Sequence, residues 1–244
     1  MEEQLLKDFF QEEVTHWWHI AKRQLIRDFL PAQYQRVLVL GVGGGCLCRE
    51  LKQSGFHVVG LDVSKMTCDH VQEKYGVETV QHNLEEGLPF KQKSFDAIII
   101  TDVLEHIRDD QQLIKSMHRC LKPGGRLLLT VPAYRHIWSY WDERLMHFRR
   151  YNFHHLRKMI EADGFMIKKI SFFNLHIYPL AFMWRKFFST RKKQQSSDFQ
   201  VSQGGRLLNT AMMGYYALER FFIKFLFLPF GLSLFVCAQK DCKD

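Results

Sequence analysis

The sequence predicts an α/β protein with a mainly parallel sheet. Apolar, β-branched segments alternate along the chain with segments of helical periodicity, as in βαβ units. The first expected strand, VLVL at 37–40, runs directly into GVGGG at 41–45, which is typical of the strand-to-helix turn of an open α/β sheet. In such sheets ligands bind at the carboxyl ends of the strands, so functional residues are expected just after strands.

The elements are expected in a simple order. A helix should occupy 3–30 and end before Pro31, because proline cannot continue it. Strands are expected at 36–40, 57–61, 78–81, 96–101, 126–131, 165–172 and 232–239, and helices at 46–54, 65–74, 109–121 and 153–163. Two further helical segments, 174–188 and 206–230, are rich in Phe, Leu, Met and Tyr, and a polar, glycine-ended loop at 189–205 separates them.

Composition limits which classes of binding partner and which cellular location are expected. The net charge of +8 favours anionic partners: nucleic acid, an acidic membrane surface or a phosphorylated substrate. The six cysteines form no CxxC pair and no matched Cys/His array, so neither a metal site nor a disulfide framework is predicted. The acidic N-terminus lacks the pattern of a signal peptide, and no apolar run reaches about 18 residues, so a cytoplasmic location is expected.

The glycine turn and a later acid point to an adenosine-containing cofactor. Gly41, Gly43 and Gly45 follow a GxGxG spacing, whereas dinucleotide binding requires GxGxxG, and Cys46 stands where the third glycine belongs. Asp62 ends the second strand about 20 residues later, where a carboxylate can accept hydrogen bonds from both ribose hydroxyls. Two plainer interpretations stay open: a structural glycine corner, and Asp62 as the N-cap of the next helix.

Four blocks, taken together, resemble the class I S-adenosylmethionine-dependent methyltransferases, in particular the group similar to ubiquinone- and menaquinone-biosynthesis enzymes. The blocks are VLVLGVGGGC (37–46), VVGLDVS (58–64), HNLEEGLPFKQKSFDAIIITDVLEHI (82–107) and CLKPGGRLLLTVPAY (120–134). The resemblance covers about residues 15–175. It implies a Rossmann-like seven-stranded sheet, mostly parallel with an antiparallel last strand and with helices on both faces. It also implies S-adenosyl-L-methionine as cofactor and methyl transfer to a small or lipid-like acceptor at O or C.

The resemblance assigns the cofactor contacts position by position. Gly41, Gly43 and Gly45 would face the methionine part of the cofactor, Asp62 would hold the ribose, and Val63 or Met66 would touch the adenine face. Asn83 would meet the adenine amino group with Leu84 packed beside it, and Asp102 and Val103 would border the sulfonium and the transferred methyl. One position departs from the family, which usually has an acid two residues before the first glycine, where this chain has Val39. An ammonium that loses such a partner forfeits about 1.5–3 kcal/mol, so a cofactor-binding protein without turnover is the first rival interpretation.

Two flanking blocks, 15–26 and 138–165, resemble segments that cap the active site in a subset of the group. Trp17 and Trp18 would cover the sulfonium with their aromatic faces, or else bury an amphipathic helix against the domain. Arg149 and Arg150, within the HFRRY element at 147–151, would clamp an anionic group of the substrate, although a solvated basic helix face explains most of this cluster equally well. If the acceptor must lose a proton, His106 and His147 are the expected bases, although a lone histidine is more often structural.

The C-terminal aromatic segment leaves two interpretations open. Five phenylalanines between 221 and 230 lie among Leu and Ile with interspersed basic residues, which suits a helix in a membrane interface and equally a buried helix. The expected division is a helical cap (1–30), a cofactor-binding core (31–175), an apolar helical insertion (176–230) and the last core strand with a tail (231–244). Peripheral membrane contact through 206–230 is therefore one expectation. Nucleic acid is not expected as a substrate, because no RNA-binding module is found and TDVLEH replaces the proline-aromatic motif of base methylases. An RNA-directed methyltransferase is the lower-ranked rival.

Overall fold

The computed structural model describes residue 10 and residues 12–179, 182–183 and 206–242. Seven strands form one sheet in the order β3-β2-β1-β4-β5-β7-β6. The strands are β1 (Arg36–Leu40), β2 (His57–Asp62), β3 (Glu78–Gln81), β4 (Phe95–Thr101), β5 (Leu121–Pro132), β6 (Phe165–Phe173) and β7 (Ser233–Lys240). The helices are α2 (Trp17–Asp28), α3 (Cys46–Gln53), α4 (Lys65–Tyr75), α5 (Asp110–Cys120), α6 (Tyr140–Arg144), α7 (Phe153–Ala162) and α9 (Arg206–Phe225), with short 3₁₀ turns η1 (Leu84–Glu86), η2 (Leu104–His106) and η3 (Arg135–Ile137).

The strand directions place the ligand crevice. β1 pairs in parallel with both β2 and β4, and β7 runs antiparallel to its two neighbours, β5 and β6. The predicted seven-stranded Rossmann-like sheet with an antiparallel last strand is therefore confirmed. The strand order reverses between β1 and β4, and open α/β sheets bind ligands at the carboxyl ends of the strands at such a reversal.

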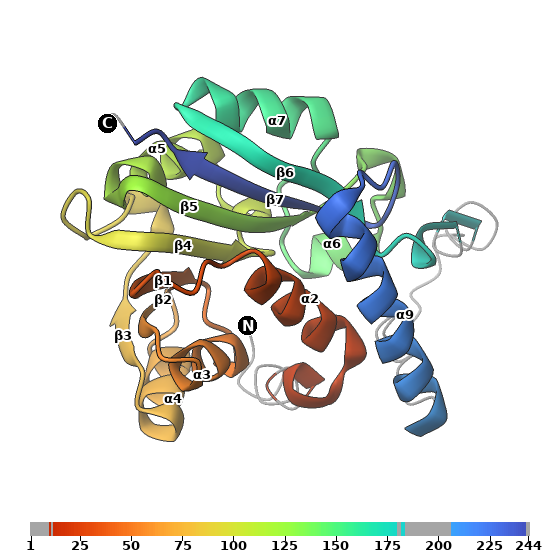
Figure 1. Cartoon of the computed structure of the whole chain (residues 1–244), viewed down its shortest axis with the longest axis horizontal. Coiled ribbons are helices and arrows are strands. Elements are labelled where there is room, and N and C mark those ends of the chain that lie inside the picture. The colour runs from red at the N-terminus through yellow and green to blue at the C-terminus, as the bar shows by residue number, and fades with distance from the viewer. Residues whose placement is uncertain (1–9, 11, 180–181, 184–205, 243–244) are drawn as a thin grey trace.

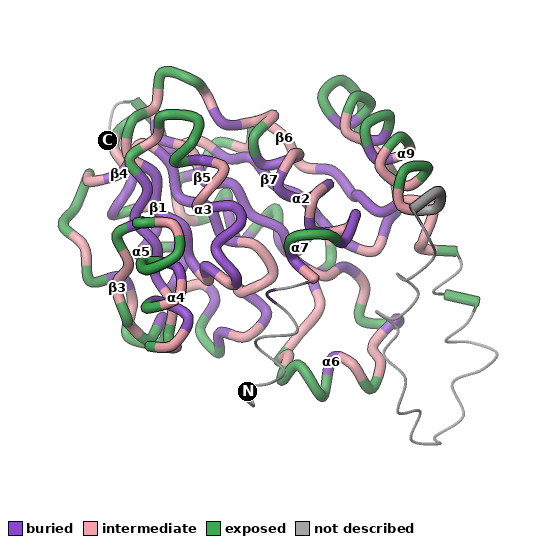
Figure 2. The backbone as a smooth tube through the Cα atoms, turned by 90° about the horizontal axis from the view of Figure 1, so that it is seen from below, coloured by how far each residue is buried: buried purple, intermediate pink, exposed green. Residues whose placement is uncertain are grey.

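Helices cover both faces of the sheet (Figure 1). On β1, Leu38 and Leu40 belong to the core layer that contains the apolar residues of α5 and α7. Val37 and Val39 face the other way, into the layer formed with α2, α3 and α4. Because the central strands are covered on both sides, their sequences are continuous apolar runs, which is why they were predictable. Figure 2 shows these strands in the buried interior and exposed residues along α9.

Three boundaries differ from the sequence expectation, and the first is that α9 ends at Phe225, whereas the helical segment was expected to run to 230. The helix expected at 3–30 is interrupted at His16, whose side chain accepts a hydrogen bond from the backbone N–H of Trp18 and so begins α2 as a separate helix. β5 begins at Leu121 rather than 126, because Leu121 already pairs with Phe95 before the register shifts to the pairing of Arg126 with Ala97. The loop expected at 189–205, and residues 180–181 and 184–188 of the helical segment expected at 174–188, lie outside the described residues.

α9 packs along α2 through one of its faces. Tyr216 stacks on Trp17 with ring centroids 5.2 Å apart, and Arg220 forms an ion pair with Asp28 at 2.9 Å. Residues 216, 219/220 and 223 are one helical turn apart, so this face is a stripe at helical spacing. None of the described helices is long and apolar enough to cross a membrane.

Glu219 makes the attachment of α9 sensitive to pH. Its buried carboxyl accepts a hydrogen bond from the backbone N–H of Leu175 at 2.8 Å, and among the described residues its second oxygen has no hydrogen-bond partner. Burial raises the pKa of Glu219 to about 7. Because the folded-state pKa exceeds the ordinary value of 4.5, the fold favours the protonated form. The resulting stabilisation is complete below pH 4.5 and is lost as the pH rises through 7.

Glu219→Gln should therefore remove much of the stability loss between pH 5 and pH 9. The shift from 4.5 to about 7 corresponds to roughly 3 kcal/mol, so at pH 8.5 the variant should unfold several degrees above the unaltered chain. Thermal unfolding across this pH range is the measurement. Glu73→Gln, at an exposed position on α4, is the matched control. A parallel pH profile for the Glu219→Gln variant and the unaltered chain would refute the role.

Candidate active site

The glycine turn joins β1 to α3 at the reversal of strand order. Gly41, Gly43 and Gly45 have φ angles of +73°, +54° and +81°, which side chains rarely adopt. A Cβ on Gly41 would also lie 2.3 Å from Cγ2 of Val103, at the end of β4. The expected corner is therefore present. A side chain at Gly41 is excluded in part because β1 and β4 approach each other closely at this point.

Asp62 lies at the end of β2 and holds the turn from the side. Its carboxylate accepts hydrogen bonds from the backbone N–H groups of Val42 at 3.2 Å and Ser64 at 3.0 Å. Burial raises the pKa of Asp62 despite these bonds. Ser64, and not Asp62, is the N-cap of α4. The carboxylate thus connects the glycine turn to the loop that follows β2.

The residues around Asp62 fit an adenosine group. Val63 is 64% exposed, a large apolar exposure for a residue at the ligand-binding edge of the sheet, and Met66 beside it is half-buried. Leu84 is buried, and the side-chain oxygen of Asn83 accepts a hydrogen bond from the backbone N–H of Glu85. An apolar face next to a carboxylate and bare backbone is the combination that an adenosine group requires.

Asp102 follows β4 and is held by a residue that the sequence did not single out. Its backbone has a φ of +52°, and its carboxylate accepts hydrogen bonds from Nζ of Lys22 at 2.5 Å and Oγ1 of Thr130 at 3.1 Å. Burial alone would raise the pKa of Asp102, but the ammonium of Lys22 holds it below its usual value. Lys22 belongs to α2, so the N-terminal helix reaches the crevice.

His106 and His147, the two expected bases, lie together with their ring centroids 4.7 Å apart. Burial and the neighbouring His147 lower the pKa of His106 to about 4. Nδ1 of His147 lies 2.9 Å from Oδ1 of Asp142, an arrangement that fixes the ring and turns Nε2 toward Oε1 of Glu105, 4.0 Å away.

Glu105 is the third member of this group. It is buried, and among the described residues neither carboxyl oxygen has a hydrogen-bond partner. Burial, followed by the nearby Asp102 carboxylate, raises the pKa of Glu105 well above its usual value. Ligand atoms of Glu105, His106 and His147 lie within 4.8 Å of one another. This donor set could accept a proton or hold a divalent cation.

The two arginines of HFRRY have internal partners. Arg149 forms an ion pair with Asp110 at 2.8 Å and donates to the backbone carbonyl of Arg108. Arg150 donates to Asp142 at 2.6 Å, and Asp142 is fully buried. Arg149 therefore braces the loop before α7. Arg150 pairs with Asp142 and also lines one of the two pockets described below.

Trp17 and Trp18 are the first two residues of α2, and they pack against α9. They belong to a small apolar cluster with Tyr216, and Trp17 is stacked on that ring. The alternative of an amphipathic helix that buries its tryptophans accounts for this position. Asp102 is reached from α2 by Lys22, which is the charged contact of this helix with the crevice.

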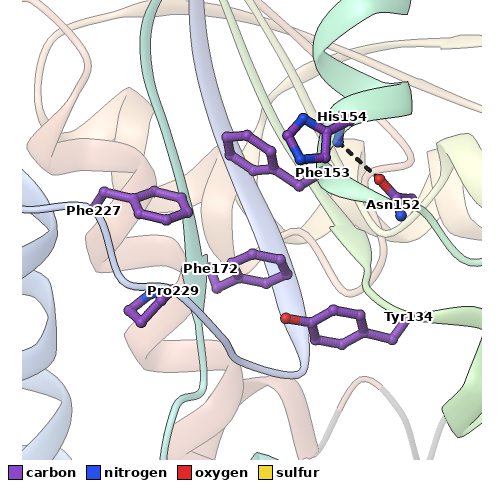
Figure 3. A pocket seen from close by; sticks show the side chains of 7 residues that line it. All are labelled: Tyr134, Asn152, Phe153, His154, Phe172, Phe227 and Pro229. Atoms are coloured by element: carbon purple, nitrogen blue, oxygen red, sulfur yellow. Dashed lines mark hydrogen bonds between the residues drawn. The ribbon is translucent and has the colours of Figure 1, made fainter.

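Two adjoining pockets lie beyond β5. The first, of about 380 Å³, is apolar and is lined by Tyr134, Asn152, Phe153, His154, Phe172, Phe227 and Pro229 (Figure 3). The second, of about 450 Å³, is lined by Tyr134, Arg135, His136, Arg150 and Asn152. Because both pockets share Tyr134 and Asn152, one amphiphilic molecule can contact an apolar and a basic surface together. Sequence reasoning missed Tyr134, although its place at the end of a strand was a usable signal.

The chain matches known methyltransferases in sequence. The family model of the methyltransferase domain matches residues 38–129, from β1 to β5. The protein named "probable S-adenosylmethionine-dependent methyltransferase" of Mycolicibacterium smegmatis is 29% identical over 162 residues, which cover 66% of this chain and 60% of that one. The ubiquinone biosynthesis O-methyltransferase of Xylella fastidiosa is 32% identical over 145 residues, which cover 51% of this chain and 57% of that one. The chain thus spans about 60% of the length of these relatives.

The fold matches as well. A crystal structure of an S-adenosylmethionine-dependent methyltransferase from Thermotoga maritima gives a TM-score of 0.64 and covers 98% of this chain and 97% of that one, at 17% identity. At this identity the likeness concerns the fold. The sequence matches carry the relationship to the family.

Proposed function

We propose that this chain, which belongs to the class I S-adenosylmethionine-dependent methyltransferases, transfers a methyl group to an amphiphilic, lipid-like acceptor at an O or C atom. The cofactor of this family is S-adenosylmethionine. The observation that carries the choice of acceptor is the pair of pockets that share Tyr134 and Asn152, one apolar and one lined by two arginines and a histidine. An apolar chain fits the first pocket and an anionic group fits the second.

The residues of the crevice supply binding and orientation. S-adenosylmethionine, when bound, supplies a methyl group on a cationic sulfur. Asp62 and the glycine turn would hold its ribose and methionine parts, and Val63 and Met66 would cover its adenine face. The carboxylate of Asp102 would face the positive charge. Alignment of two reactants in such a site can lower a barrier by roughly 7–11 kcal/mol, so few further groups are needed.

An acceptor hydroxyl or activated carbon must also lose a proton. His147 suits this role better than His106, because Asp142 fixes its Nδ1 and so leaves the lone pair on Nε2. The low pKa of His106, about 4, makes that ring a weak base at neutral pH. In this scheme the proton passes to Nε2 of His147 as the acceptor gains the methyl group. The Asp142 carboxylate, on Nδ1, then stabilises the imidazolium.

Binding and transfer are tested in two steps. Calorimetric titration with S-adenosylhomocysteine tests the cofactor site, and the absence of measurable affinity would exclude the enzyme interpretation. Transfer of labelled methyl from S-adenosylmethionine to phenols that carry an apolar tail and an anionic group is then compared with transfer to the same phenols without the tail. Affinity without transfer to any acceptor would favour the rival, a cofactor-binding protein without turnover.

The outward face of α9 supports contact with a membrane surface. Leu218, Phe221, Phe222 and Phe225 share one face of the helix at helical spacing, and all four are exposed. Phe227, just beyond the helix, lines the apolar pocket. In the sequence, the exposed face of α9 is therefore followed directly by a residue of the apolar pocket. With a net charge of +8, the protein would approach an anionic bilayer and take a lipid-like acceptor from it.

Phe221→Ser combined with Phe225→Ser should reduce flotation with vesicles of anionic lipid at least about fivefold, because each buried aromatic side chain contributes about 1.5–3 kcal/mol. Met166→Ser, at an exposed apolar position on β6, is the matched control. Affinity for S-adenosylhomocysteine should stay unchanged in both variants. Equal flotation of the double variant and the unaltered chain would discard the membrane contact.

A further inference from the structure

Gly44 is a glycine that neither the GxGxG spacing nor the expected cofactor contacts explain. A Cβ at this position would lie 2.7 Å from Oε2 of Glu13 and 3.1 Å from Cα of Phe10. The segment before α2 therefore passes so close to the turn that only glycine fits beneath it. The packing of the chain's own N-terminal segment therefore accounts for the glycine at position 44.

Glu13 bonds directly to this turn. Its buried carboxylate accepts a hydrogen bond from the backbone N–H of Gly44 at 2.6 Å, and the N–H of Cys46 also donates to it. These groups lie at the start of α3, whose N-cap, Gly45, has no side chain to accept a bond. A carboxylate at this end of a helix satisfies unpaired N–H groups and complements the helix dipole.

The position of Glu13 is fixed by its neighbours. Nη1 of Arg23 donates to the backbone carbonyl of Glu13 at 2.7 Å, while Nε of Arg23 donates to Glu50 on α3 at 2.8 Å. Phe10, three residues earlier, stacks on His70 of α4 with ring centroids 4.6 Å apart. The segment is thus tied to both helices that border the crevice.

No side chain of β1 can accept the hydrogen bonds that the N–H groups of the glycine turn donate to Glu13. Val39, whose side chain faces the α3 side of the sheet, is an apolar residue packed in the core cluster of that layer. The carboxylate that reaches the turn comes from Glu13, 31 residues before Gly44 in the chain.

We propose that Glu13 is a positioning residue of the cofactor site, which holds the glycine turn in the conformation that receives the amino-acid end of the cofactor. This inference rests on the proposed function. It makes the segment around residue 13 a part of the binding site. It also explains how the chain keeps an ordered turn with Val39 on β1.

The test compares two ligands by calorimetry: S-adenosylhomocysteine, and 5′-methylthioadenosine, which lacks the amino-acid part. Glu13→Ala should lower the affinity for S-adenosylhomocysteine at least about tenfold, since it removes charge-assisted bonds that order the turn. The affinity for 5′-methylthioadenosine should change less than about twofold, because the Asp62 side of the crevice stays intact. Glu13→Gln keeps an acceptor oxygen and should retain part of the affinity for S-adenosylhomocysteine.

Glu12→Ala removes a carboxylate from the same segment and is the matched control; it should bind both ligands like the unaltered chain. Thermal unfolding of each variant is measured alongside, and Glu13→Gln is the variant to use where Glu13→Ala does not fold. Equal loss of both ligands in the Glu13 variants would show a general structural role and overturn the proposal, as would unchanged affinity for S-adenosylhomocysteine. An unaltered chain that binds neither ligand would instead overturn the proposed function.

Discussion

Asp62→Ala is expected to weaken the binding of S-adenosylhomocysteine at least about 100-fold. The Asp62 carboxylate is expected to accept hydrogen bonds from two ribose hydroxyls, and the loss of each bond costs about 1.5–3 kcal/mol of binding free energy. About 1.4 kcal/mol corresponds to a factor of ten in affinity. The same carboxylate holds the N–H groups of Val42 and Ser64, so its removal also loosens the turn. Calorimetric titration measures the effect.

The two ligands of the Glu13 experiment separate the two carboxylates. Asp62→Ala should weaken 5′-methylthioadenosine as strongly as S-adenosylhomocysteine, because both contain the ribose. Asp69→Ala, at an exposed position on α4 that pairs with Lys65, should leave both affinities unchanged. If Asp62→Ala retained full affinity, the carboxylate would serve only as a brace of the loop.

The residues that could be predicted from sequence follow local rules. The strands are continuous apolar runs because they are covered on both faces, and Gly41 and Asp62 stand at fixed distances from them. These features depend on neighbours within one βαβ unit. Their positions at the carboxyl edge of the sheet therefore followed from the order of the elements.

The residues that escaped prediction act across long separations. Lys22 and Asp102 are 80 residues apart in the chain, and Glu13 and Gly44 are 31 apart. Such pairs depend on where the N-terminal segment packs against the rest of the fold. The spacing of apolar residues in the sequence does not determine that position. The tryptophans of α2 illustrate the same limit, because their partner, Tyr216, lies on a helix near the other end of the chain.

Asp142→Ala should lower the free energy of unfolding by about 3–5 kcal/mol, as is typical when one partner of a buried ion pair is removed. The Asp142 carboxylate is fully buried and bonds to Arg150, His147 and Ser139. These contacts hold its pKa well below the usual value against the effect of burial. Without the carboxylate, the Arg150 guanidinium keeps its charge at a position only 9% exposed. Denaturant unfolding is the measurement, and Glu143→Ala, at an exposed neighbouring position, is the control.

A double variant separates the cost of a stranded charge from the loss of the bonds. Asp142→Ala with Arg150→Met should recover part of the stability lost in Asp142→Ala alone, since the unpaired buried cation is then absent. Turnover should not recover with it. His147 would still lack the partner on Nδ1 that leaves its lone pair on Nε2, and general base catalysis contributes about 10²–10⁴ to rates. Recovery of turnover together with stability would mean that Asp142 supports the fold alone and that His147 is not the base.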